Sequence, residues 1–209
     1  MIGLLVLLSI QAVGQSSKKT KQGMKASTFY GGISSSSFTF SSAIDSDLDM
    51  DLRFKTSYCL GYQFDIYSSR MTALTASIGL GNAGAVTHYY TQRVDYNLAY
   101  IHAQLGPSFL LTAGKITGII LGGGIYGGYL AVGTQEAGEL YIDLKREEVF
   151  ESFDVGFYAR AGLRIKAHRN NAIQIQASLL QGLIDIEQDE TQELFNRQLQ
   201  FTVGYQIIF

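Results

Sequence analysis

Four aspartates occupy alternate positions of one short segment, Asp45, Asp47, Asp49 and Asp51. Alternate side chains of an extended backbone point the same way, and carboxylate oxygens are preferred ligands of Ca²⁺. The glycine and the terminal glutamate of an EF-hand loop are absent. Two interpretations therefore stay open: a site for loosely bound Ca²⁺ or Mg²⁺, and a solvated acidic loop with no cofactor.

Catalytic chemistry has little basis in this sequence. The three histidines, His88, His102 and His168, do not stand in a spacing that assigns a Ser–His–acid triad. A single cysteine, Cys59, excludes disulfide frameworks and paired-cysteine zinc sites. Phosphate-binding loops and basic patches interleaved with aromatic residues are also absent. We predict no catalytic residues and no nucleic-acid partner.

Five titratable side chains lie in segments that otherwise carry almost no charge. They occupy the same alternate positions as the polar residues around them, and they are Asp65, His102, Asp154, Arg160 and Arg164. A charge removed from water is tolerated when it is paired. We therefore predict that these side chains form a salt-bridge network in the interior of the protein.

The segments that carry these side chains alternate between apolar and polar residues, which is typical of β-strands with one apolar face. In 153–165 that face holds Phe153, Val155, Phe157, Ala159, Ala161, Leu163 and Ile165. Six further strands are predicted at 26–37, 58–66, 74–80, 99–105, 173–179 and 199–209.

An uncharged run at 116–132 has the length of a short transmembrane helix. It contains six glycines, and each interior glycine costs a helix about 1 kcal/mol relative to alanine. We therefore predict an eighth strand there. Pro107 cannot donate to a strand ladder, so a β-bulge is predicted at its position.

The connections between these strands alternate in length, and their charges differ. Short links at 68–70, 112–115 and 168–171 alternate with long ones at 38–54, 83–96, 133–150 and 183–196. The long links hold fifteen of the 18 acidic residues and four of the 16 basic ones, a net charge of −11 that leaves +9 for the rest. This layout predicts an all-β fold, an eight-stranded antiparallel up-and-down transmembrane β-barrel with short periplasmic turns and long extracellular loops.

A soluble barrel of the lipocalin type is the alternative, and it keeps its apolar face inside. Its outer face would be rich in charge, but charged residues make up 16% of this chain, against about 25% in soluble proteins. Aromatic residues stand near the ends of the apolar face, where interfacial girdles lie: Tyr58, Tyr129, Phe153, Phe109 and Phe209. Eight strands enclose a space that side chains can fill, which favours a plugged lumen over a narrow pore.

The first residues have the pattern of a cleaved secretory signal. An apolar run is followed by Ala12-Val13-Gly14, which fits the small-x-small rule for cleavage. We predict a signal peptide at 1–14, a basic lead at 15–25 and the barrel domain at 26–209; a buried N-terminal strand is the alternative. Export then leads to the outer membrane.

Three segments resemble the PorT-like outer-membrane β-barrel family: 122–130, 153–163 and 201–209, the last ending in Phe209. The resemblance covers nearly all of the chain after the signal. The sequence departs from the family pattern at 100–107. The resemblance implies a small eight-stranded barrel of Gram-negative bacteria. It assigns no activity, and members of the family need not share a function.

The last strand is also similar to the sorting signal that the outer-membrane assembly machinery reads. Tyr205, Ile207 and Phe209 alternate and end on an aromatic residue; the alternative is simply a last strand that closes the barrel.

We expect a monomer that contacts outer-membrane lipid and lipopolysaccharide. Divalent ions would lie between the acidic loops and the lipopolysaccharide. The expected role is structural or one of interaction at the cell surface. A secretion-accessory or small-pore transport protein is the alternative, followed by a lipocalin-like ligand carrier and a lipid A-modifying enzyme.

Overall fold

The computed structural model describes residues 23–41, 53–89, 92–112, 116–138, 140–147, 149–186 and 193–209. These residues form ten β-strands. Their bounds are β1 Lys25–Ser41, β2 Arg53–Tyr67, β3 Thr72–Ala83, β4 Ala85–Tyr89, β5 Gln92–Thr112, β6 Thr117–Ala137, β7 Leu140–Asp143, β8 Phe153–Lys166, β9 Asn171–Gly182 and β10 Glu193–Ile208. In the described part of the chain, no helix is long and apolar enough to cross a membrane.

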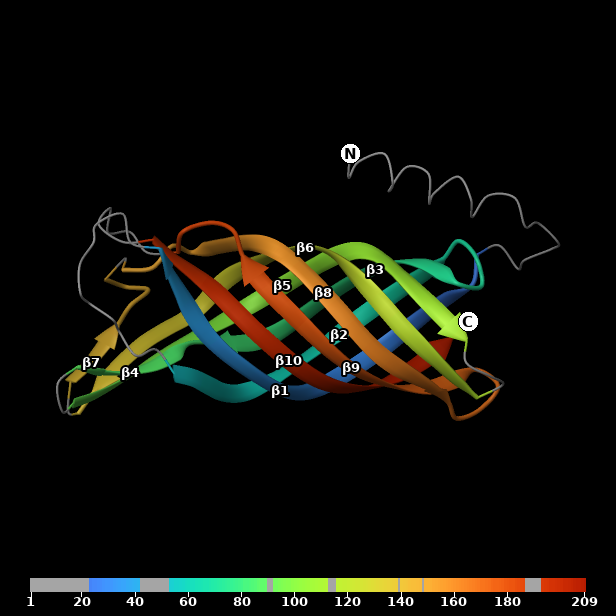
Figure 1. Ribbon diagram of the computed structural model, residues 1–209, viewed down its shortest axis with the longest axis horizontal. Helices are drawn as coiled ribbons and strands as arrows, with labels where there is room; N and C mark the ends of the chain where they lie inside the picture. Colours follow the sequence, from blue (N-terminus) through green and yellow to red (C-terminus); the bar gives the residue numbers. More distant parts are fainter. Residues whose placement is uncertain are drawn as a thin grey trace.

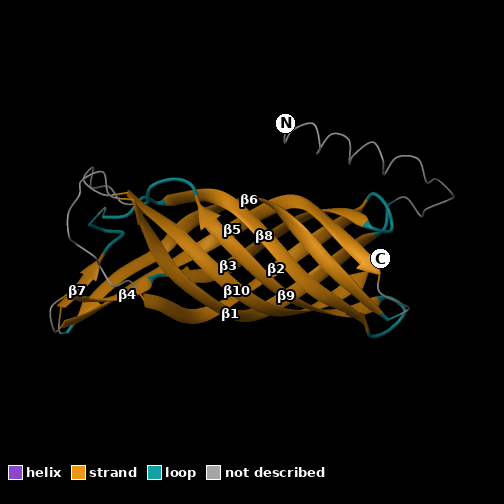
Figure 2. Cartoon of the chain, viewed as in Figure 1, coloured by secondary structure: helices purple, strands orange, loops and turns teal. Residues whose placement is uncertain are grey.

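Eight long antiparallel strands close into a barrel, as the sequence predicts. They pair in chain order through β1, β2, β3, β5, β6, β8, β9 and β10, and β10 pairs back with β1 over its whole length. Each of these strands thus has a partner on both sides (Figure 1). We call them the wall, and β4 and β7 extend it at the end that carries the long connections (Figure 2).

Side chains alternate between the two faces along much of the wall. In β8, Phe153, Val155 and Phe157 are exposed on the outside, whereas Asp154 and Tyr158 are buried inside. β10 alternates in the same way. The exterior is thus an apolar belt and the interior is polar, which is the arrangement of a transmembrane barrel and excludes the lipocalin type.

The predicted aromatic residues mark the two edges of the belt. Tyr58, Tyr129 and Phe153 are exposed near the long connections, and Phe109 and Phe209 near the short turns. The rings of Tyr129 and Phe153 lie 5.4 Å apart. The closed wall and its apolar belt place the chain in the outer membrane, since barrels of this type lie there.

The strands continue into segments that the sequence predicts as long loops. β4 and the start of β5 cover most of 83–96, β6 runs on to Ala137, and β7 pairs with its end. Backbone hydrogen bonds between antiparallel strands do not require an apolar face, so pairing continues beyond the belt into water.

The predicted β-bulge at Pro107 was wrong. The register between β5 and β6 shifts between Ala99 and Tyr100, and it is the same on both sides of Pro107. Glycines allow a close backbone approach there, since a Cβ on Gly106 would lie 2.1 Å from the Gly123 carbonyl oxygen.

Residues 1–22 lie outside the described part. The signal peptide at 1–14 and the basic lead at 15–25 stay predictions.

Candidate functional site

The lumen of the barrel is lined by the polar side chains that the sequence places on the inner face. Asp65, His102, Asp154 and Arg160 are buried, with exposed fractions of 2%, 4%, 1% and 6%, and Arg164 is half-buried. All five face the interior, but they do not form one network.

Asp65 on β2 is the centre of the first network. Its carboxylate accepts hydrogen bonds from Gln63 Nε2 at 3.0 and 3.1 Å, from Thr75 Oγ1 at 2.7 Å and from Gln206 Nε2 at 3.2 Å. These donors come from β2, β3 and β10. Such bonds stabilise a buried carboxylate without a cation in contact with it.

Glutamine amides connect the two arginines to this carboxylate. Arg160 donates to Gln63 Oε1, and Arg164 Nε donates to Gln206 Oε1 at 2.7 Å, while the amide nitrogens of both glutamines donate to Asp65. We call this arrangement the glutamine relay. The prediction of direct salt bridges was wrong for these groups: among the lumen side chains that the structure describes, no ion pair joins them.

Arg160 is held by further contacts in the centre of the barrel. Its Nη2 donates to Gln104 Oε1 at 2.9 Å, and its guanidinium carbon lies 4.8 Å from the centre of the Tyr158 ring. Gly122 leaves room for it, because a Cβ there would lie 3.2 Å from Arg160 Cγ. The side chain thus reaches from β8 to β2 and β5 and fills the lumen between them.

A second cluster lies around Asp154, apart from the arginines. Tyr126 donates to Asp154 Oδ2 at 2.8 Å, and Asn196 Nδ2 donates to the same oxygen at 3.0 Å. His102 packs between Tyr100 and Tyr126, with ring centres 5.7 and 6.0 Å away. Neither of its ring nitrogens has a hydrogen-bond partner within the described residues, so His102 does not join the predicted network.

An apolar cluster lies inside the barrel at the end that carries the long connections. Its buried members, which we call the apolar cap, are Phe38, Ala83, Ala85, Leu98, Tyr100, Leu130, Leu144, Phe150, Ile186 and Leu194. Leu144, Phe150 and Ile186 lie outside the strands and pack inward against the wall. The Phe150 ring stacks on Phe38 at 6.1 Å.

Two small cavities lie among the polar side chains of the lumen. A cavity lined by Gln63, Gln104 and Arg160 has a volume of about 10 Å³, and another, lined by Asp65, Arg164 and Gln174, also has about 10 Å³. One water molecule needs about 10 to 15 Å³. At these two places the space is thus about that of one water molecule.

The sequence reasoning missed the glutamines and the apolar cap. The sequence contains a pattern that indicates each of them. Buried glutamines recur at inward positions, namely Gln63, Gln104, Gln174, Gln176, Gln198, Gln200 and Gln206. Leucines replace polar residues at the inward positions Leu98, Leu130 and Leu194, which marks where the polar lumen ends.

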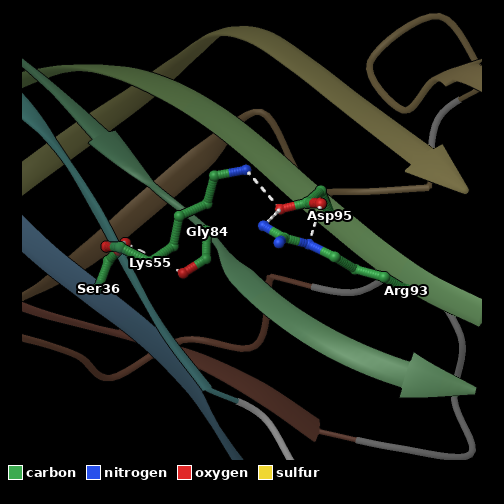
Figure 3. A network of polar contacts seen from close by, with 5 residues as sticks. All are labelled: Ser36, Lys55, Gly84, Arg93 and Asp95. Carbon is green, nitrogen blue, oxygen red and sulfur yellow. Dashed lines mark hydrogen bonds and ion pairs between the residues drawn. The ribbon is translucent and has the colours of Figure 1, made fainter.

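A polar network orders the strands beyond the apolar belt (Figure 3). Lys55 Nζ lies 3.2 Å from Asp95 Oδ1, and Arg93 Nε lies 2.7 Å from Asp95 Oδ2. The hydrogen bond from Arg93 lowers the pKa of the Asp95 carboxyl from its usual value. Ser36 Oγ donates to the Gly84 carbonyl at 3.0 Å, where the chain passes from β3 to β4 with a φ of 154°.

The remaining predicted sites are placed as follows. Tyr205, Ile207 and Phe209 are exposed on the outside of the wall at the end of the chain, and their role in assembly stays a prediction. Asp45, Asp47, Asp49 and Asp51 lie outside the described residues. Within the described part, no group of three or more His, Cys, Asp or Glu side chains could hold a metal ion.

The two histidine side chains that the structure describes lie in different parts of the barrel. His168 is exposed in the turn between β8 and β9, and His102 is buried with no hydrogen-bond partner among the described residues. The side chain of His88 is not described.

No family model matches the sequence, and no curated protein matches it either. The PorT-like resemblance therefore stays a prediction that rests on the three motifs.

Solved structures of outer-membrane proteins are similar to this chain. The outer membrane protein OprG from Pseudomonas aeruginosa has a TM-score of 0.55 at 10% identity, over 88% of this chain and 95% of that one. Neisserial surface protein A has a TM-score of 0.47 at 10% identity over 86% and 96%. Ail of Yersinia pestis has a TM-score of 0.44 at 13% identity, over 87% of this chain and 98% of that one. The likeness to OprG agrees with the strand pairing: the chain has the fold of a small outer-membrane β-barrel.

Proposed function

We propose that this protein is a closed barrel of the outer membrane with a structural or interaction role at the cell surface, and that it neither conducts nor catalyses. The observation that carries the proposal is the glutamine relay. It joins Asp65 on β2 to Arg160 on β8 across the centre of the lumen. A pore would need a continuous path of water where these side chains lie.

Two further features support a closed state. The apolar cap covers the end that carries the long connections, and an apolar constriction excludes water and ions. The cavities beside the relay have volumes of about 10 Å³ each, which is close to the least that one water molecule needs. An ion would thus meet an apolar barrier and then a filled polar layer.

The charges of the long connections fit a role in interaction. They carry most of the acidic residues of the chain, and in an outer-membrane barrel long loops face outward. Divalent cations such as Ca²⁺ or Mg²⁺ would bridge these acids to anionic lipopolysaccharide, with Asp45, Asp47, Asp49 and Asp51 as ligands. We also propose that the barrel is a monomer and that the assembly machinery reads Tyr205, Ile207 and Phe209.

Planar-bilayer recording of the refolded protein tests the closed state. We expect no steady conductance from the wild type. Arg160→Ala removes the centre of the polar layer but leaves the cap, so only brief openings are expected. Adding Phe150→Ala, which removes a ring that contacts both Phe38 and Tyr96, should lengthen these openings.

Arg169→Ala is the matched control, because Arg169 is exposed in a turn and its loss leaves the lumen filled. Heat-modifiable gel mobility must show that every variant is folded. A large steady conductance of the wild type would refute the closed state and would favour the small-pore alternative.

A further inference from the structure

At the end of the barrel that carries the short turns, the exposed charged side chains that the structure describes are all basic. Lys25, Arg70, Lys166 and Arg169 are exposed there, together with His168. The described residues of this end are 23–26, 66–73, 109–112, 116–119, 165–172 and 206–209, and none of them is an acidic residue. We call the four lysines and arginines the basic rim.

Backbone hydrogen bonds join the turns of the basic rim into one edge. Lys25 N donates to the Phe209 carbonyl at 3.0 Å, and Phe209 N donates back at 2.9 Å. Ile208 N donates to the Asn170 carbonyl at 2.7 Å, and Lys166 N donates to the Ile116 carbonyl at 2.8 Å. The basic side chains therefore stand on an ordered scaffold, so a partner that binds them orders little additional backbone.

Large apolar side chains stand beside the bases on the same edge. Met71 follows Arg70, Ile116 pairs with Lys166, and Phe209 pairs with Lys25. Their exposed fractions are 51%, 63% and 63%. Side chains this apolar mark the boundary of the hydrocarbon, so the bases beside them lie at the depth of the lipid headgroups.

We propose that the basic rim binds anionic phospholipids in the leaflet that the short turns face. Arginine and lysine donate charge-assisted hydrogen bonds to phosphate oxygens, and the apolar neighbours contact the acyl chains of the same lipid. A soluble anionic partner would use the charges but would have no use for Met71, Ile116 and Phe209. The inference rests on the insertion of the barrel in a membrane, and it does not depend on whether the lumen conducts.

Spin-label spectroscopy of the refolded full chain in phosphatidylcholine vesicles tests the proposal. Lipids labelled near the end of the acyl chain report the fraction that the barrel immobilises. We expect phosphatidylglycerol to associate about fivefold more strongly than phosphatidylcholine, the effect of about one basic side chain at an anionic surface. The preference should vanish in about 1 M salt, where the Debye length is about 3 Å.

Two quadruple variants separate the basic rim from the total charge. Lys25→Gln, Arg70→Gln, Lys166→Gln and Arg169→Gln together should abolish the preference. Arg53→Gln, Arg93→Gln, Arg146→Gln and Arg197→Gln change the net charge equally toward the other end and should preserve it. Equal association of both lipids with the wild type, a preference that persists in the first variant, or an equal loss in both variants would overturn the proposal.

Two controls identify the source of failure and the nature of the ligand. Heat-modifiable mobility in phosphatidylcholine shows whether the barrel inserts at all, and a chain that fails to insert would refute the membrane fold itself. Soluble glycerol phosphate, compared with sodium chloride of equal ionic strength, should displace no labelled lipid. Specific displacement would show a site for free phosphate and would overturn the assignment to lipid.

Discussion

Replacing Gln63 by alanine tests whether neutral amides hold the buried charges of the lumen. Gln63 accepts a hydrogen bond from Arg160 and donates to both carboxylate oxygens of Asp65. A hydrogen bond to a charged group contributes about 1.5 to 3 kcal/mol. With one such contact to each charge, we expect Gln63→Ala to lower the free energy of unfolding by about 3 to 6 kcal/mol.

Gln200→Ala is the matched control for this change. Gln200 is also a buried glutamine of the lumen, but its one described hydrogen bond goes to the neutral Gln198, at 3.2 Å. A neutral bond contributes about 0.5 to 1.5 kcal/mol. Both variants remove the same atoms from a buried site, so the cost of the cavity is similar and the difference reports the two charged contacts.

Urea unfolding of the refolded barrel in lipid vesicles, followed by gel mobility and circular dichroism, gives both free energies. The slopes with urea concentration must agree if only stability changes. We expect Gln63→Ala to cost at least about 1.5 kcal/mol more than Gln200→Ala, from the same bond energies. Equal losses would refute the reasoning, because they would mean that the relay adds nothing beyond packing.

Two further predictions concern the wall and its extension. In β6, Gly124→Ala should cost about 3 kcal/mol or more of unfolding free energy, since a Cβ there would lie 2.2 Å from the Leu105 carbonyl oxygen. A Cβ on Gly127 would have no atom within 4 Å, so Gly127→Ala should cost far less in the same urea assay. Equal costs would contradict the close approach. For Asp95, the pKa is lowered by Arg93, so its contribution is present above the unfolded pKa of about 3.9 and is lost as pH falls through the lower folded value. Protection of the β4 and β5 amides from hydrogen exchange should therefore fall in acid, by less than about fivefold. In Asp95→Asn the protection should already have this lower value at neutral pH. Protection that is independent of pH and equal in both proteins would contradict this.

The wall could be predicted because its physics is local. Alternation in 153–165 shows which side chains share a face, and a lipid-facing row must be apolar whatever strands lie beside it. Phe153 and Val155 are exposed and Asp154 is buried, as the sequence indicates. The extent of the strands was less predictable, because pairing beyond the belt depends on the neighbouring strand and not on alternation.

The bulge illustrates a different limit. Pro107 lacks a donor, and this favours an irregularity in a ladder. The glycines opposite it allow the backbones to approach closely without a change of register, and the shift occurs at Ala99 instead. The residues that face Pro107 on the neighbouring strand are set by the register between the two strands. The sequence of one strand does not reveal that register.

The sequence alone determined which side chains point inward, that they include charges, and that the two ends of the barrel differ in sign. The tertiary structure decided which of these groups meet. Arg160 and Gln63 are 97 residues apart, and Gln206 and Asp65 are 141 apart; barrel closure and strand register bring them together. The geometry of each strand decides which side chains face inward, whereas the tilt and pairing of all eight wall strands decide which of them are in contact across the lumen. For this reason the sequence predicted ion pairs where the structure has the glutamine relay.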